Sequence, residues 1–145
     1  MRYELIDDVL DLDEGRITAR KQVTAAEEYL ADHFPGFPIL PGVMMLEVMV
    51  QAARRLLDGS VDYHVVLGSA RAIKYGAMVR PGQALKVEVT VGDPDEDGVF
   101  ACFGTGIVEG GPNDGDTAIS GRFTMRSVRL APSAQTTMQE SDTTC

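Results

Sequence analysis

The sequence has no tryptophan, only two cysteines and two histidines, and no long apolar run. Cys102 lies in an apolar segment and Cys145 ends a polar tail, so neither a disulfide nor a metal–thiolate site is expected. A membrane helix needs roughly 18 or more consecutive apolar residues, and no segment is that long. We therefore expect no membrane insertion, and we expect Cys102 to be a small core residue.

Basic residues are also scarce. The chain has 13 Lys and Arg against 22 Asp and Glu, a net charge of -9. Nucleic acids and anionic membranes both bind basic surfaces, so this balance argues against both as partners. The start of the chain, Met-Arg-Tyr-Glu-Leu-Ile-Asp-Asp, lacks the apolar core of a signal peptide. The expected location is the cytoplasm.

The residues that are present suit one folded domain. A chain of 145 residues that is 44% hydrophobic can form one core. We expect a single domain over residues 1–130 and a disordered tail over residues 131–145, which are rich in Ser, Thr and Gln. Residues 3–12 suit a helical turn or a short edge strand. The pattern of apolar and polar residues predicts strands at Arg16–Val23, Tyr63–Val79, Ala84–Val91, Val99–Val108 and Thr117–Arg129.

One segment is apolar on nearly every side of a predicted helix. Residues 43–57 read Val-Met-Met-Leu-Glu-Val-Met-Val-Gln-Ala-Ala-Arg-Arg-Leu-Leu, which is typical of a buried helix. The preceding residues 33–42 contain three prolines and two glycines, which predict an ordered loop without regular structure. A buried helix followed by antiparallel strands predicts an α+β domain, whose sheet wraps the helix and covers all of its faces.

Two polar side chains interrupt this helix. Glu47 and Gln51 are the only polar residues between Gly42 and Arg54, and their spacing of four places them on one helical face. A buried carboxylate without partners is costly, so it usually has a partner, a proton or a function. For Glu47 taken alone, a structural hydrogen bond or a solvent gap is an equal alternative.

A histidine and a helix start stand close to this carboxyl group in the sequence. His33 precedes Phe-Pro-Gly, which limits where its ring can point, whereas His64 is expected to be a surface or packing residue. Gly42 and Val43 open the helix, where unpaired N–H groups can hold an oxygen that gains negative charge. Together these features predict a base, two amide donors and an acid about 7–8 Å further along the helix.

The whole segment resembles a known family. Residues 33–53 read His-Phe-Pro-Gly-Phe-Pro-Ile-Leu-Pro-Gly-Val-Met-Met-Leu-Glu-Val-Met-Val-Gln-Ala-Ala, which is similar to the signature of bacterial 3-hydroxyacyl-[acyl-carrier-protein] dehydratases. Weaker similarity extends over residues 3–129. The resemblance implies a hot-dog fold, in which a curved antiparallel sheet wraps a long helix. It also implies a homodimer in which each site joins His33 of one chain to Glu47 of the other, with trimers of dimers in some members.

The resemblance implies a reaction as well. A (3R)-hydroxyacyl thioester of acyl-carrier protein or coenzyme A would lose water to give the trans-2-enoyl thioester. Neutral His33 would remove a proton from C2, and the Gly42 and Val43 amides would hold the thioester oxygen. Glu47 would protonate the departing hydroxyl and Gln51 would orient Glu47. No cofactor is expected, because no redox step occurs.

Glu47 and Val43 resemble the plain dehydratases rather than the dehydratase–isomerases, which have Asp and Cys at these positions. The loop Gly110–Asp116 is longer than the family usually has.

Two other functions remain open at this point. A hot-dog thioesterase would use water as its nucleophile and would have no use for His33, and a non-catalytic acyl-binding subunit would need neither His33 nor Glu47. A carrier protein is acidic, so docking requires a local basic patch. We expect Lys74 and Arg80, six residues apart on one face of a regular strand, to form it, although solvated strand charges are the plain alternative.

Overall fold

The computed structural model describes residues 5–24, 39–58 and 64–127. The predicted base His33 and the predicted tail 131–145 lie outside these ranges. The described residues form one α-helix and a six-stranded antiparallel sheet with the strand order β1-β2-β4-β5-β6-β3. The elements are β1 (Asp8–Asp13), β2 (Arg16–Gln22), α2 (Gly42–Asp58), β3 (Val65–Tyr75), β4 (Ala84–Pro94), β5 (Val99–Glu109) and β6 (Thr117–Ser127).

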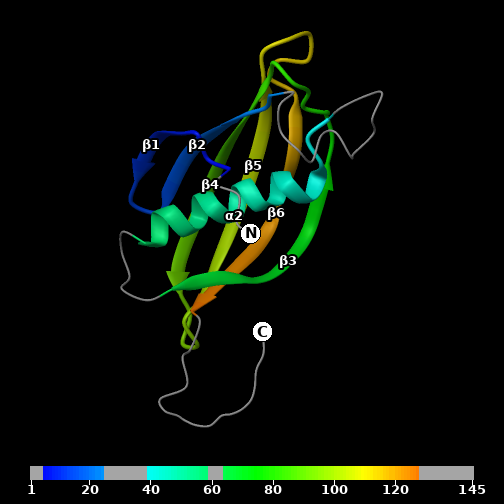
Figure 1. Cartoon of the computed structure of the whole chain (residues 1–145). Helices are drawn as coiled ribbons and strands as arrows, with labels where there is room; N and C mark the ends of the chain where they lie inside the picture. The colour runs from blue at the N-terminus through cyan, green and yellow to red at the C-terminus, as the bar shows by residue number, and fades with distance from the viewer. Residues whose placement is uncertain (1–4, 25–38, 59–63, 128–145) are drawn as a thin grey trace.

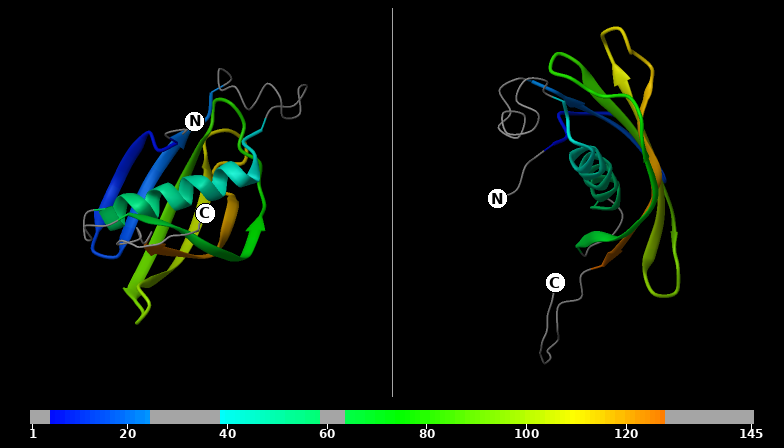
Figure 2. Two further views of the ribbon diagram at one scale, coloured as in Figure 1. Left: turned by 60° about the horizontal axis from the view of Figure 1, so that its bottom comes forward. Right: turned by 90° about the vertical axis from the view of Figure 1, so that its right-hand side faces the viewer.

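The sheet is strongly curved and α2 lies across its concave side (Figure 2). The N-terminal end of α2 lies beside β3 and its C-terminal end lies toward β1 and β2 (Figure 1). Since β3 and β1 are the two edges of the sheet, α2 spans the sheet from one edge to the other.

Successive side chains of each strand point to opposite faces of the sheet, and those on the concave face pack against α2. In β4, Leu85, Val87 and Val89 are fully buried on the concave side, which is the period-two pattern of a sheet with one covered face. Gly104 of β5 lets α2 approach closely, because a Cβ atom there would lie 2.6 Å from the Met49 sulfur. The core is therefore the layer between α2 and the concave face.

Most predicted elements are confirmed. The helix predicted over residues 43–57 spans Gly42–Asp58, and residues 3–12 contribute an edge strand, β1. A hairpin joins β4 to β5, and the loop Gly110–Asp116 joins β5 to β6.

Two expectations are wrong in detail. The strand predicted over Tyr63–Val79 ends at Tyr75, where Gly76 passes so close to β6 that a Cβ would lie 2.6 Å from the Thr117 oxygen. The sheet also leaves one face of the first helical turn uncovered, since Val43 is 69% exposed. Within the described ranges no helix has the length and hydropathy needed to cross a membrane.

Candidate active site

A cavity of about 390 Å³ opens at the N-terminus of α2. Its lining includes Gly42 and Val43, the two predicted amide donors. The N–H groups of Met44 and Met45 both donate to the Pro41 carbonyl, at 3.0 and 3.1 Å. No described residue accepts a hydrogen bond from the N–H of Gly42 or Val43. These two amides and the positive end of the helix dipole can therefore bind an anionic oxygen.

The ring of Tyr75 explains why position 42 is a glycine. A Cβ atom on Gly42 would lie 2.8 Å from Cε1 of Tyr75, so the ring packs directly on the backbone of the first helical turn. Tyr75 also lines the cavity. Tyr75 was not predicted to belong to the site, because the sequence pattern placed it in the interior of a longer strand. The Gly76-Ala77 pair was the available signal that the strand ends here.

Glu47 and Gln51 lie together on α2, as predicted. The Gln51 side-chain amide Nε2 donates to Glu47 Oε2 at 3.1 Å, and the backbone N–H of Leu5 donates to Gln51 Oε1 at 2.9 Å. Gln51 is 8% exposed and Glu47 is partly buried. Because the Leu5 amide engages the carbonyl oxygen of Gln51, the NH₂ group of Gln51 is the end that faces Glu47.

The structure thus brings four predicted site residues onto the first three turns of one helix. Gly42 and Val43 face the cavity, whereas Glu47 and Gln51 lie further along α2 and are not part of its lining. The part played by Leu5 was not predicted, because it depends on a contact across 46 residues of sequence. The role of each residue stays a prediction.

The expected geometry of Lys74 and Arg80 is wrong. Lys74 lies in β3, but Arg80 follows the end of that strand, so the two do not share a strand face. A bulge in β3 instead changes the register between Arg71 and Lys74, with Ala72 at a φ of 56°. Arg71 then pairs with Arg122 and Lys74 with Ser120, which puts Arg71, Lys74 and Arg122 on the convex face of the sheet.

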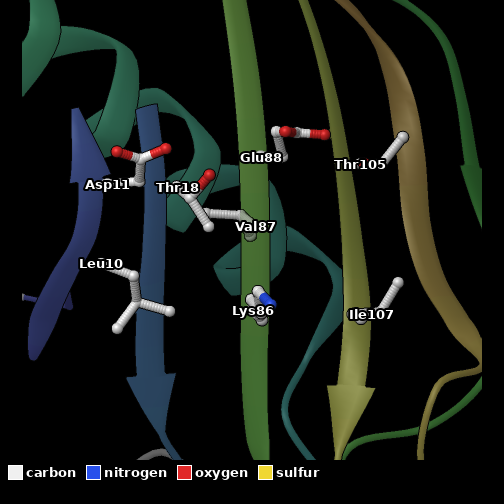
Figure 3. A pocket seen from close by; sticks show the side chains of 8 residues that line it. All are labelled: Leu10, Asp11, Thr18, Lys86, Val87, Glu88, Thr105 and Ile107. Carbon is white, nitrogen blue, oxygen red and sulfur yellow. The ribbon is translucent and has the colours of Figure 1, made fainter. Parts of the chain in front are cut away.

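A second hollow lies on that convex face. It has a volume of about 410 Å³ and is lined by side chains of β1, β2, β4 and β5, among them Thr18, Glu88 and Thr105 (Figure 3). None of the predicted site residues lines it.

Cys102 belongs to the core rather than to a site. Its side chain is buried, as expected, and burial raises the pKa of its thiol to about 12 although a hydrogen bond to the Met125 backbone opposes the shift. A thiol that stays protonated is a poor nucleophile.

Solved structures with the same fold include smu.793 from Streptococcus mutans bound to acetyl CoA, with a TM-score of 0.65, 15% identity, and coverage of 88% of this chain and 92% of that one. Another is the dehydratase heterocomplex ApeI:P from Xenorhabdus doucetiae, with a TM-score of 0.62, 17% identity, and coverage of 86% and 99%. A curved antiparallel sheet around one long helix defines a hot-dog-fold protein, as expected.

The sequence comparisons are more specific. The family model of the ApeI-like dehydratases, described as ApeI dehydratase, matches residues 10–110. The chain is 36% identical over 110 residues to the 3-hydroxyacyl-[acyl-carrier-protein] dehydratase FabZ of Oenococcus oeni, covering 73% of this chain and 78% of the relative. It is 37% identical to FabZ of Janthinobacterium, covering 73% and 72%, and 41% identical to FabZ of Variovorax paradoxus, covering 61% and 64%. The chain therefore belongs to the ApeI-like dehydratase family, and the FabZ dehydratases are among its relatives.

Proposed function

We propose that the chain dehydrates 3-hydroxyacyl thioesters, carried by acyl-carrier protein, to trans-2-enoyl thioesters in fatty-acid or related lipid synthesis, and that it does so in the cytoplasm. The observation that supports this proposal is the placement of two backbone amides and one carboxyl group along α2, in a chain that belongs to a dehydratase family. Gly42 and Val43, whose N–H groups have no acceptor among the described residues, line an apolar cavity, and a carboxyl group bonded by Gln51 follows a little more than one helical turn later.

The amides serve the first half of the reaction. Removal of the C2 proton leaves negative charge on the thioester oxygen, and the N–H groups of Gly42 and Val43 would stabilise it there. The base is proposed to be His33, whose neutral imidazole is suited to proton removal near neutral pH. The loop that carries His33 lies outside the described residues.

Glu47 serves the second half. The C3–O bond breaks, the electron pair of the broken C2–H bond forms the C2–C3 double bond, and the departing hydroxyl takes a proton from Glu47 to leave as water. Gln51 donates to Glu47 Oε2, so the acidic proton is directed to the other carboxyl oxygen, Oε1. Gln51 is thus proposed to be a positioning residue for the acid.

A second copy of this chain is proposed to complete each site. Val43, Tyr75 and Met78 are apolar or aromatic side chains that are 69%, 55% and 45% exposed beside the cavity. They adjoin β3, which is an edge strand of the sheet. Exposed apolar side chains beside an unpaired strand edge favour association. We propose a homodimer in which His33 of one protomer meets Glu47 of the other, with a trimer of such dimers as the larger assembly.

The carrier protein is proposed to dock at Lys74. The register of β3 adds Arg71 and Arg122 to this patch, while Arg80 lies in the turn after the strand. Arg71, Lys74 and Arg122 are exposed on one face of the sheet, and in a chain of net charge -9 they form a local positive surface that an acidic carrier can recognise.

One assay tests the function. The protein is incubated with a 3-hydroxybutyryl and a 3-hydroxydecanoyl thioester, and enoyl absorbance and free thiol are followed together. Enoyl formation without thiol release supports the dehydratase. Thiol release would show a thioesterase, and no change with either substrate would show a non-catalytic acyl-binding protein.

A further inference from the structure

The loop Gly110–Asp116 is tied to a wall of the cavity at the α2 N-terminus. The Asn113 side chain donates through Nδ2 to the carbonyl oxygen of Met78 at 2.9 Å. Met78 lines the cavity together with its neighbours Tyr75 and Ala77. A loop that follows β5 therefore bonds the segment that follows β3.

Gln83 fixes the loop on its other side. Its amide Nε2 donates to the Gly110 carbonyl at 2.8 Å and to Asn113 Oδ1 at 2.5 Å, and its Oε1 accepts from the Arg80 N–H at 2.9 Å. Gln83 is 8% exposed, and its three bonds are partly buried, which strengthens them relative to bonds that lie fully in water. Because Gln83 occupies Oδ1 of Asn113, the NH₂ group of Asn113 is the end that faces Met78.

The loop itself is held in one shape. Gly110 N–H donates to Asp114 Oδ1 at 2.6 Å, and Gly115 N–H donates to the Val108 carbonyl at 2.7 Å. Gly111 has a φ of 77° and packs against Gln83, where a Cβ would lie 2.5 Å from Nε2. Only glycine meets both requirements. Because the loop has a fixed shape, the hydrogen bond from Asn113 fixes the position of the Met78 carbonyl.

Met78 depends on this contact more than its neighbours do. Gly76 and Ala77 donate to the backbone of β6 at 2.9 Å, and the Val79 carbonyl accepts from the Leu40 N–H at 2.8 Å. The Met78 carbonyl is held by a side chain, Asn113. Met78 is also 45% exposed in the single chain, so packing within one protomer does not fix it.

We propose that Asn113 and Gln83 are positioning residues that set the Met78 wall of the cavity and thereby determine how well long acyl chains bind. This inference rests on the proposed function. The other residues that line the cavity include Leu40, Val43 and Met45, an apolar surface suited to an acyl chain. A long chain gains more from an ordered apolar wall than a short chain, because it buries more surface against it.

The test uses two substitutions at position 113 in the full chain. Asn113→Asp keeps an acceptor for Gln83 and loses the donor to Met78, whereas Asn113→Ala loses both. Pro112→Ala, an exposed neighbour in the same loop, is the matched control. KM and kcat are measured with 3-hydroxybutyryl and 3-hydroxydecanoyl thioesters of N-acetylcysteamine, and melting temperatures are recorded for all variants.

We expect both substitutions at Asn113 to raise KM for the decanoyl substrate about fivefold, the effect of one lost hydrogen bond. The butyryl KM and both kcat values stay near those of the parent, and Pro112→Ala behaves as the parent does. An equal rise in KM for both substrates, or no rise, would overturn the inference and leave the dehydratase function standing. A parent protein that dehydrates neither substrate would overturn the proposed function, and this inference with it.

Discussion

Replacing Gln51 by methionine should separate its part in catalysis from its part in folding. Methionine has a similar length and no amide, so it removes the acceptor for the Leu5 N–H and the donor to Glu47. A buried N–H left without a partner costs about 2 kcal/mol. In a domain of this size that lowers the melting temperature by roughly 6 °C. The same change frees the Glu47 carboxyl to rotate, and we expect kcat for dehydration to fall about tenfold, which is about 1.4 kcal/mol.

Gln51→Glu is the matched variant. A glutamate retains an oxygen that accepts from the Leu5 N–H, so the melting temperature should fall less than in Gln51→Met. It also places a second carboxyl group beside Glu47, and two neighbouring carboxyls share a proton over part of the pH range. We therefore expect the pH profile of kcat to change in Gln51→Glu, which would show that the Glu47 carboxyl takes part in the reaction.

The assay is enoyl absorbance at saturating substrate across a pH series, with thermal unfolding measured in the same buffers. A Gln51→Met protein with a lower melting temperature and an unchanged kcat would refute the positioning role. It would leave Gln51 as a residue that only attaches the segment containing Leu5 to α2.

Three further outcomes are expected. Glu47→Gln should be inactive and at least as stable as the parent, because it keeps the shape and a hydrogen bond to Gln51 but is not an acid; large destabilisation in a thermal melt would indicate a structural role instead. Mixing inactive His33→Ala with inactive Glu47→Gln should restore activity, since a mixed dimer holds one intact site, and no recovery after verified subunit exchange would place each site within one chain. Replacing Arg71 and Lys74 together by Glu should raise KM for a carrier-bound substrate and leave an N-acetylcysteamine thioester unaffected, and equal effects on both would exclude docking there.

The sequence predicted the elements well because their signals are local. The apolar run from Val43 and the alternation around Leu85 each follow from side-chain spacing, so the helix was found to within one residue at each end, and the strand begins at the predicted residue and ends three residues later. The spacing of Glu47 and Gln51 likewise predicted a contact that the structure contains. These residues lie within one element, where geometry depends on sequence separation alone.

What could not be predicted depends on contacts between distant segments. The ring of Tyr75 on Gly42 and the bond from Leu5 to Gln51 both require the whole sheet to be in place. The bulge at Ala72 places Arg71 and Lys74 on the same face of the sheet, and no turn residue in the sequence marked it. The bond from Asn113 to Met78 joins two loops 35 residues apart.

The strand order in the sheet differs from the order in which the ribosome makes the strands. β3 is made before β4, β5 and β6, yet its partner within the chain is β6, and the first paired residues, Val65 and Ser127, are 62 positions apart. When β3 leaves the ribosome it has no partner, and β2, β4 and β5 can pair while it waits. Tyr75 pairs with Ile119 of β6, and Gly76 and Ala77 donate to the Ala118 and Thr117 carbonyls, so this wall of the cavity is bonded to the last strand made. A nascent chain that ends before Thr117 lacks both the strand that pairs with β3 and Ala118, which lines the cavity at the α2 N-terminus.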